Sequence, residues 1–227
     1  MTENEKTRKG DFVELKYTGK ANGEIFDSNI EEDLKKINSK VKPQKAIIII
    51  GQHMVVPGLD KALEDKSLNA EYEVSFSYKD GFGERNRNLI RTIPLKAFTE
   101  HKLHPQAGMV LTLDNALVKI LAVSGARVTA DFNNPLASKD LEYKFTITRI
   151  VTDEKEKTES FFSFFLLFIP DFEINDKTVV VKASKSLEIM VNLLKNKFED
   201  YKLKISVFSI LIENEKVDIK FWENIES

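Results

Sequence analysis

Hydrophobic and polar residues alternate in three separated stretches of the chain, and this pattern predicts the strands of an antiparallel sheet. The alternation runs over residues 11–17, over residues 72–78 and over the ten residues 141–150. A further short strand is expected to end at Phe26, because Gly23 precedes it as a turn residue. The last stretch is expected to close the sheet that the first one opens.

Two other segments of the same region have patterns of their own. Residues 47–50 are four consecutive isoleucines, which predicts a strand buried on both faces. Pro57, followed by the apolar residues Leu59 and Leu63, predicts a helix that begins at the proline. Residues 30–45 are polar and rich in lysine, so they form either a connection or a short helix.

The segment from Asn88 to Ala130 interrupts this sheet and contains apolar strands of its own. These strands are expected over residues 109–113, 117–123 and 128–130, with turns between them. The segment is therefore interpreted as a subdomain inserted into the first domain. The predicted organisation is a first domain of residues 1–87 and 131–152, an insert of residues 88–130, and a C-terminal α+β domain of residues 153–227.

The C-terminal unit begins with a charged run at residues 153–159, which has the composition of a linker or, equally, of a solvated helix face. Its apolar positions predict an α+β arrangement. The expected elements are a helix over residues 160–168, a hairpin around Asn175 and Asp176, a strand over 178–182, a helix over 186–201, and two strands over 203–212 and 216–222.

Composition narrows the choice of compartment and partners. With 42% hydrophobic and 31% charged residues, the 227-residue chain is expected to be globular, and a net charge of −2 favours neither nucleic acid nor an anionic membrane as partner. No cysteine is present, which fits a reducing cytoplasm. The longest apolar run, residues 161–169, is about half the roughly 20 residues of a membrane span, so we expect no membrane insertion.

Several motifs follow one another in an order that resembles a known family. They are Tyr17-Thr18-Gly19, the segment Gly23–Ser28, the segment Gly51–Leu63 and Gly81-Phe82-Gly83. Over residues 9–152 the chain resembles FKBP-type peptidyl-prolyl cis-trans isomerases. Residues 88–130 lie where SlyD-like members carry their insert-in-flap subdomain, and the extra C-terminal unit resembles the long archaeal members. The resemblance implies an α+β fold, with an FKBP-like antiparallel half-barrel sheet wrapped on a short helix and a small β-rich flap insert.

The resemblance also implies a site for the proline of a substrate. Phe82 stands where the family usually has tyrosine, Leu59 where some members have tryptophan, and Ser138 where glycine is frequent. The loss of a hydroxyl at Phe82 bears on how strongly a substrate carbonyl is bound. The pocket residues carried over by motif are Tyr17, Phe26, Asp27, Val55, Val56, Leu59, Phe82, Leu136 and Tyr143.

The implied activity needs no cofactor and no metal. Rotation about an Xaa-Pro bond crosses a barrier of about 18–20 kcal/mol, and the twisted amide is favoured where water is excluded. An apolar aromatic pocket is sufficient for this, with Asp27 in an electrostatic or shaping role. Without the resemblance, the aromatic residues are ordinary core, Asp27 is a turn residue, and the pair His101 and His104 is solvated rather than metal-binding.

The insert and the C-terminal unit are expected to serve binding rather than chemistry. Apolar residues of the insert, namely Leu95, Phe98, Leu103 and Met109, form either an exposed groove for unfolded clients or the insert's own core. The partners are then unfolded or nascent polypeptides with Xaa-Pro bonds. Phenylalanines of residues 161–168 predict a homodimer contact or docking onto the chain's own sheet. Two alternative functions remain: a catalytically weak holdase, and an adaptor that docks through residues 153–227.

Overall fold

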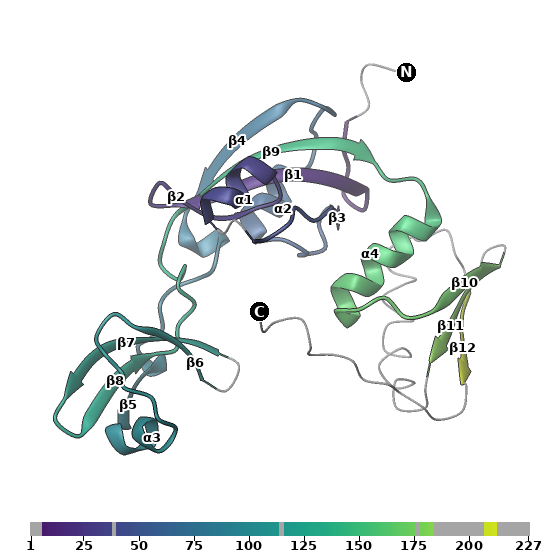
Figure 1. Cartoon of the computed structure of the whole chain (residues 1–227). Coiled ribbons are helices and arrows are strands. Elements are labelled where there is room, and N and C mark those ends of the chain that lie inside the picture. Colours follow the sequence, from purple (N-terminus) through teal and green to yellow (C-terminus); the bar gives the residue numbers. More distant parts are fainter. Residues whose placement is uncertain (1–5, 38–39, 114–115, 176–177, 184–206, 213–227) are drawn as a thin grey trace.

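The computed structural model describes residues 6–37, 40–113, 116–175, 178–183 and 207–212. Within these ranges the fold is α+β, with antiparallel sheets and few helices, as the sequence predicts. Figure 1 shows three sheets in separate parts of the chain, of which the first, built from N-terminal strands and β9, arches over a short helix.

The first sheet has five antiparallel strands. Its path runs β2 (Glu24–Ser28), β1 (Phe12–Ala21), β9 (Leu141–Ile150) and β4 (Glu71–Phe76), and β3 (Ala46–Ile49) pairs with the first half of β1. Helix α1 (Glu31–Ile37) follows β2, and α2 (Pro57–Ala62) begins at the proline that predicted it. The closing role predicted for residues 141–150 is confirmed, because β9 lies between β1 and β4.

The strand β3 is buried on both faces, as its four isoleucines predict. Ile48 and Ile50 belong to a core with Leu59 and Leu63 of the α2 region, whereas Ile47 and Ile49 belong to a second core on the other face. The strand β1 is divided in the same way, because its alternating side chains point to opposite faces. The strand β3 and the start of β1 therefore lie between the α2 region and the helix α4.

The insert forms a second sheet with a core of its own. Its elements are β5 (Ile90–Pro94), α3 (Leu95–Glu100), β6 (Val110–Leu113), β7 (Ala116–Ser124) and β8 (Arg127–Asp131), in the antiparallel order β5-β8-β7-β6. The predicted strands are confirmed. The sequence pattern missed β5 and α3 because residues 90–100 show weak periodicity. Short 3₁₀ helices at Tyr78–Asp80 and Arg87–Leu89 precede the insert.

Residues 153–159 were consistent with either a linker or a helix face, and they form the first turns of α4 (Glu154–Leu166). The side chain of Asp153 caps the helix by accepting a hydrogen bond from the backbone N–H of Glu156, at 2.8 Å. Phe161 and Phe162 are fully buried against Phe12 of β1, so the apolar end of the helix anchors the charged end. The alternative interpretation, a solvated helix face, is the one observed.

Part of a third sheet follows α4. Strand β10 (Phe172–Asn175) pairs antiparallel with β11 (Thr178–Ala183), which confirms the predicted hairpin, and β12 (Val207–Ile212) pairs parallel with β11. Strand β12 falls inside the range predicted for a strand at residues 203–212. The helix expected over residues 186–201 and the strand over 216–222 lie outside the described residues. No helix among the described residues is long and apolar enough to cross a membrane.

An ion-pair network joins α4 to the first sheet. The guanidinium of Arg149 donates to Glu14 at 2.8 Å and to Glu156 at 2.9 Å, and the ammonium of Lys45 lies 2.6 Å from Glu156. Hydrogen bonds from Lys45, and then from Arg149, hold the pKa of Glu156 below its usual value. Together with the burial of Phe161, these contacts place α4 beside β3.

The loop between β3 and α2 is held by one buried carboxylate. Asp60 is 3% exposed, and its two oxygens accept hydrogen bonds from the backbone N–H groups of Gly51, at 2.8 Å, and His53, at 3.0 Å. Because both oxygens are used, the loop has a defined course up to Val55 and Val56, which precede the helix.

We expect Asp60→Asn to lower the free energy of unfolding by about 1–3 kcal/mol, because an amide has one acceptor oxygen and leaves one of the two backbone N–H groups without this acceptor. Urea unfolding measures the change. Asp65→Asn is the matched control, since Asp65 is exposed and its pair with Lys6 is a surface ion pair. Equal stability of the two variants would contradict the anchoring role of Asp60.

Candidate functional site

The residues that the sequence nominated for the proline pocket come together at one core of the first sheet. Tyr17 lies on β1, Phe26 on β2 and Tyr143 on β9, and these strands are neighbours. The loop before α2, the turn after β4 and the connection back from the insert supply the remaining apolar members. Tyr17, Phe26, Val55, Val56, Leu59, Phe82, Leu136 and Tyr143 all belong to this core or pack against it.

Rings of Tyr17, Phe26, Phe82 and Tyr143 form a set that we name the aromatic cup. The Phe26 ring lies edge-on to Tyr143, with centroids 5.8 Å apart and an interplanar angle of 88°, and edge-on to Phe82 at 6.0 Å and 81°. The Tyr17 and Tyr143 centroids are 6.2 Å apart. Edge-to-face pairs of this kind are favourable contacts and fix the orientation of the rings.

Gly19 permits this approach of the rings, and only its place in the Tyr17-Thr18-Gly19 motif singled it out in the sequence. It pairs with Tyr143 across the β1–β9 ladder. A Cβ atom at Gly19 would lie 2.9 Å from the Phe26 ring and 2.9 Å from the Tyr143 ring, closer than real Cβ contacts allow. Any side chain at this position would therefore push the cup apart.

A further ring, that of Phe76, packs against the cup. The sequence patterns did not nominate it. It stacks on Tyr143 with centroids 5.8 Å apart and planes 11° from parallel. The Phe76 ring also contacts Gly58 of α2, where a Cβ atom would overlap the ring. The alternation of residues 72–78 predicted a strand here but not which face meets the cup.

The nine nominated residues differ in how far they reach the surface. Leu59 is 1% exposed and forms part of the floor, so it supports the site rather than touching a ligand. Val55, Val56, Phe82 and Leu136 are half-buried at the rim. Asp27 is the exposed member, on β2.

Asp27 acts on the cup through the hydroxyl of Tyr17. That hydroxyl donates a hydrogen bond to a carboxylate oxygen of Asp27 at 2.9 Å. Burial, followed by the negative charge and hydrogen bond of Asp27, raises the pKa of Tyr17, and burial with the same charge raises the pKa of Tyr143. Both phenols therefore stay neutral well above neutral pH. A ligand in the cup meets aromatic rings and neutral hydroxyls.

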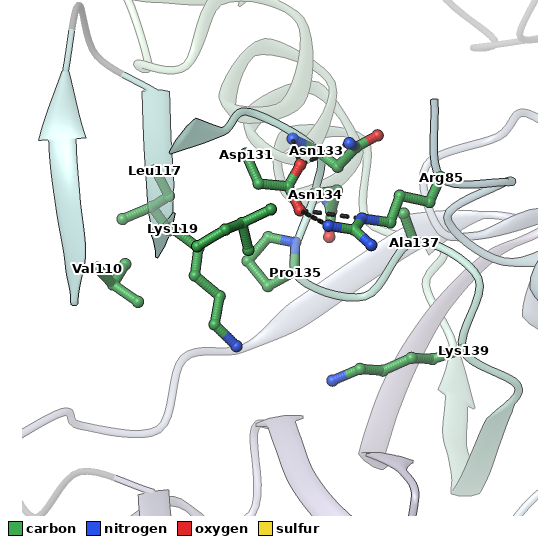
Figure 2. Close-up of a pocket in the computed structure, with 11 residues that line it drawn as sticks. Arg85, Val110, Leu117, Lys119, Asp131, Asn133, Asn134, Pro135, Ala137 and Lys139 are labelled. Atoms are coloured by element: carbon green, nitrogen blue, oxygen red, sulfur yellow. Dashed lines mark hydrogen bonds and ion pairs between the residues drawn. The ribbon is translucent and has the colours of Figure 1, made fainter. Parts of the chain in front are cut away.

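A polar cluster closes the junction between the first domain and the insert (Figure 2). The guanidinium of Arg85 donates twice to one oxygen of Asp131, at 2.6 and 3.0 Å, while the side-chain amide of Asn133 donates to the other oxygen at 2.6 Å. Burial alone would raise the pKa of Asp131, but the hydrogen bonds from Asn133 and the Arg85 guanidinium outweigh burial and lower it. The sequence motifs did not indicate that these three residues interact.

The four insert residues nominated for client binding do not form an exposed groove. Phe98 is 3% exposed and sits in the insert core with Val118, and Leu95 and Leu103 pack partly buried against that core. The expectation is therefore wrong for Phe98, because α3 turns its apolar side onto the sheet. Met109, at 39% exposed, is accessible.

The exposed apolar residues of the insert lie elsewhere, on its edge strand and the next one. Val110 of β6 and Leu117 of β7 are each 56% exposed. His101 and His104 are both exposed. Within the described part of the chain, no group of three or more His, Cys, Asp or Glu side chains is arranged to hold a metal ion.

Comparison with known proteins gives matches to two family models in adjoining parts of the chain. Residues 3–98 match the FKBP-type peptidyl-prolyl cis-trans isomerase family, and residues 91–136 match the IF domain of FKBP26. The first match contains the β1, β2 and α2 regions that bear most of the cup. The second contains the strands of the insert.

Individual relatives agree with these models. A short-type peptidyl-prolyl cis-trans isomerase of Methanocaldococcus jannaschii is 29% identical over 153 residues, which cover 66% of this chain and 97% of that protein. The FKBP-type peptidyl-prolyl cis-trans isomerase SlyD of Helicobacter pylori is 23% identical, covering 66% of this chain and 78% of that protein. SlyD of Aeromonas hydrophila is 25% identical over 52% of this chain and 56% of its own length.

The order of the motifs, the strands that bring the aromatic rings together and the insert between β4 and β9 all agree with the two family matches. Residues 3–136 of this chain therefore belong to the FKBP-type peptidyl-prolyl cis-trans isomerase family.

Proposed function

We propose that this enzyme catalyses rotation about Xaa-Pro bonds in unfolded or nascent chains of the cytoplasm, and that the substrate proline binds in the aromatic cup. The observation that carries the proposal is the set of four rings around Gly19, with both tyrosines kept neutral. A pyrrolidine ring is apolar and compact, and aromatic faces and edges are its natural contacts.

The chemistry requires differential binding of the twisted amide rather than proton transfer. Resonance is lost in the transition state, so its carbonyl is less polar than that of the planar amide and loses less when water is excluded. An acceleration of 10⁴ to 10⁵ corresponds to roughly 5.5–7 kcal/mol. Exclusion of water by Phe26, Phe82 and Tyr143, together with ring packing on the proline, would supply this energy without a cofactor.

Asp27 and Tyr17 have a shaping role in this proposal. The hydrogen bond from Tyr17 fixes its ring at the wall of the cup, and the exposed carboxylate adds a negative potential at the rim. Phe82 contributes an edge to Phe26 but has no hydroxyl to donate to a substrate carbonyl. The missing hydroxyl means that Phe82 would contact a substrate by packing and not by a hydrogen bond. This feature supports the alternative of a weaker isomerase that acts mainly as a holdase.

We further propose that the insert binds unfolded clients and that the C-terminal unit mediates contacts between proteins. The exposed apolar residues Met109, Val110 and Leu117 support client binding on the insert. A client held there reaches the cup in an intramolecular step, which raises its effective concentration. Leu167, 81% exposed, and Ile169, 52% exposed, follow the buried phenylalanines of α4 and support a homodimer contact or an adaptor surface.

The isomerisation rate constant should be independent of pH between about 6 and 9, because burial raises the pKa of both cup tyrosines and no group transfers a proton. Exchange NMR on a short Xaa-Pro peptide measures the rate without a coupling enzyme. Tyr17→Phe should keep the flat profile with a rate lowered by a few fold. A bell-shaped profile in the parent enzyme would contradict the proposed chemistry.

Removal of residues 88–130 should separate the two activities. With a short Gly-Ser link in their place, suppression of client aggregation should disappear while isomerisation of a short peptide survives, because the cup is built outside the insert. The double change Val110→Asp and Leu117→Asp in the full chain should have the same effect without shortening it. Undiminished aggregation suppression in both variants would rule out the insert as the client-binding part.

A further inference from the structure

A groove of about 460 Å³ lies where the insert meets the connection back to the first domain. Its apolar surface comes from Val110 and Leu117 on the outer face of the insert sheet and from Pro135 in the connection. Arg85, Lys119 and Lys139 also line it, and Figure 2 shows the side chains of the two lysines extending toward the same opening beside Pro135. The groove is thus both apolar and cationic.

The positive charge of this groove is not balanced by its own carboxylate. Asp131 is the acidic residue of the lining, and both of its oxygens are already bound by Arg85 and Asn133. Lys119 pairs with Asp131 in the β7–β8 register, yet neither Lys119 nor Lys139 forms an ion pair with any residue in the described ranges. Two ammonium groups are therefore left for a ligand, on a chain whose net charge is −2.

We propose that this groove binds unfolded client segments in which an acidic side chain stands next to apolar residues. The apolar side chains of the segment would cover Val110, Leu117 and Pro135, and its carboxylate would pair with Lys119 and Lys139. Apolar contact area beside the charges fits a polypeptide rather than a phosphate polymer. The proposal rests on the proposed client binding by the insert and names the class of segment that the insert selects.

The position of the groove connects client capture to the aromatic cup. Residues 133–139 separate the two sites: Leu136 packs against the core of the cup, whereas its neighbours Pro135 and Ala137 line the groove. A segment in the groove is therefore only one loop away from the cup. A proline a few residues along the same client chain falls within reach.

The polar junction gives the groove a fixed shape. The side-chain oxygen of Asn133 accepts a hydrogen bond from the backbone N–H of Asn86 at 2.7 Å, and its amide nitrogen donates one to the Asn86 carbonyl at 3.0 Å. The two segments that connect the insert to the first domain are thereby joined. The backbone N–H of Arg85 donates to the hydroxyl of Ser138 at 2.8 Å. A preorganised groove spends less of its binding free energy on ordering itself.

Binding of labelled, proline-free peptides to the full chain tests this proposal by fluorescence anisotropy. Three peptides share one leucine- and phenylalanine-rich centre and carry flanking Glu, Gln or Lys. We expect the Glu peptide to bind with a Kd about three- to tenfold lower than the Gln peptide, and the Lys peptide to bind most weakly. The preference should shrink as salt is added, since exposed ion pairs are screened.

Charge reversal identifies the groove as the source of the preference. Lys119→Glu with Lys139→Glu should make the Lys peptide the tightest ligand, while short-peptide isomerisation shows that the fold is intact. The matched control is Lys96→Glu with Lys102→Glu, because α3 and the turn after it pack on the opposite face of the insert sheet. The control should leave the order of affinities unchanged.

Each of the other outcomes contradicts a specific part of the account. Equal affinity for the three peptides, or an equal effect of the control pair, would overturn the acidic selectivity of the groove while leaving client binding by the insert in place. No binding of any peptide, together with undiminished aggregation suppression after removal of residues 88–130, would overturn the proposed client binding itself.

Discussion

The approach of the Phe26 and Tyr143 rings over Gly19 is the constraint on which the site depends. It requires a residue without a side chain near the end of β1, and it requires β2 and β9 to flank that strand. It also requires Phe76 beneath Tyr143, and hence Gly58 beneath Phe76. Gly19 and Gly58 thus allow the rings of Phe26, Tyr143 and Phe76 to pack together.

The strand β1 also has packing contacts on its other face. Val13 and Leu15 pack toward α2, while Phe12 packs with Phe161 and Phe162 of α4. This arrangement makes the C-terminal helix part of the support of the site-bearing sheet rather than a separate appendage. Loss of α4 packing would expose Phe12 at the start of β1 and Ile49 of β3.

Charge is distributed in a way that suits the proposed division of labour. The cup holds neutral rings and phenols, and the one carboxylate associated with it, Asp27, is at the rim. Ionic contacts are placed where elements join: Arg149 with Glu156 at α4, and Arg85 with Asp131 at the insert. The electrostatics of the fold therefore fix the relative positions of parts, while the proposed chemistry relies on exclusion of water.

Sequence patterns predicted the long strands of the first sheet because their period of two is plain, as in β9, and predicted β3 because its isoleucines are buried on both faces. Motif order nominated the cup residues, although nothing in a linear pattern distinguishes the buried floor residue Leu59 from the rim residue Val56. The sequence patterns did not predict the specific side-chain contacts, because these are set by tertiary packing. Examples are the contact of Phe76 with Tyr143, that of Asp60 with the loop before α2, and that of Asp131 with Arg85.

The points that the sequence left open have the same origin. The charged run at residues 153–159 has the composition of a linker, but it is helical because Asp153 caps it and Phe161 anchors it. The weak periodicity of residues 90–100 left Phe98 open between a client groove and the insert's own core, and one turn of α3 places its ring in that core. Short helices take their buried face from the sheet they meet, and that sheet is not visible in the local sequence.

The central claim is that the aromatic cup is the isomerase site, and its most direct test is the cis-to-trans exchange rate of a short Xaa-Pro peptide by NMR. The rate is compared for the intact enzyme and for the double variant Tyr17→Ala with Phe26→Ala, after circular dichroism has shown that both are folded. The account predicts strong acceleration by the intact enzyme and its loss in the folded variant. Absence of acceleration by the intact enzyme, or equal acceleration by the folded variant, would contradict it.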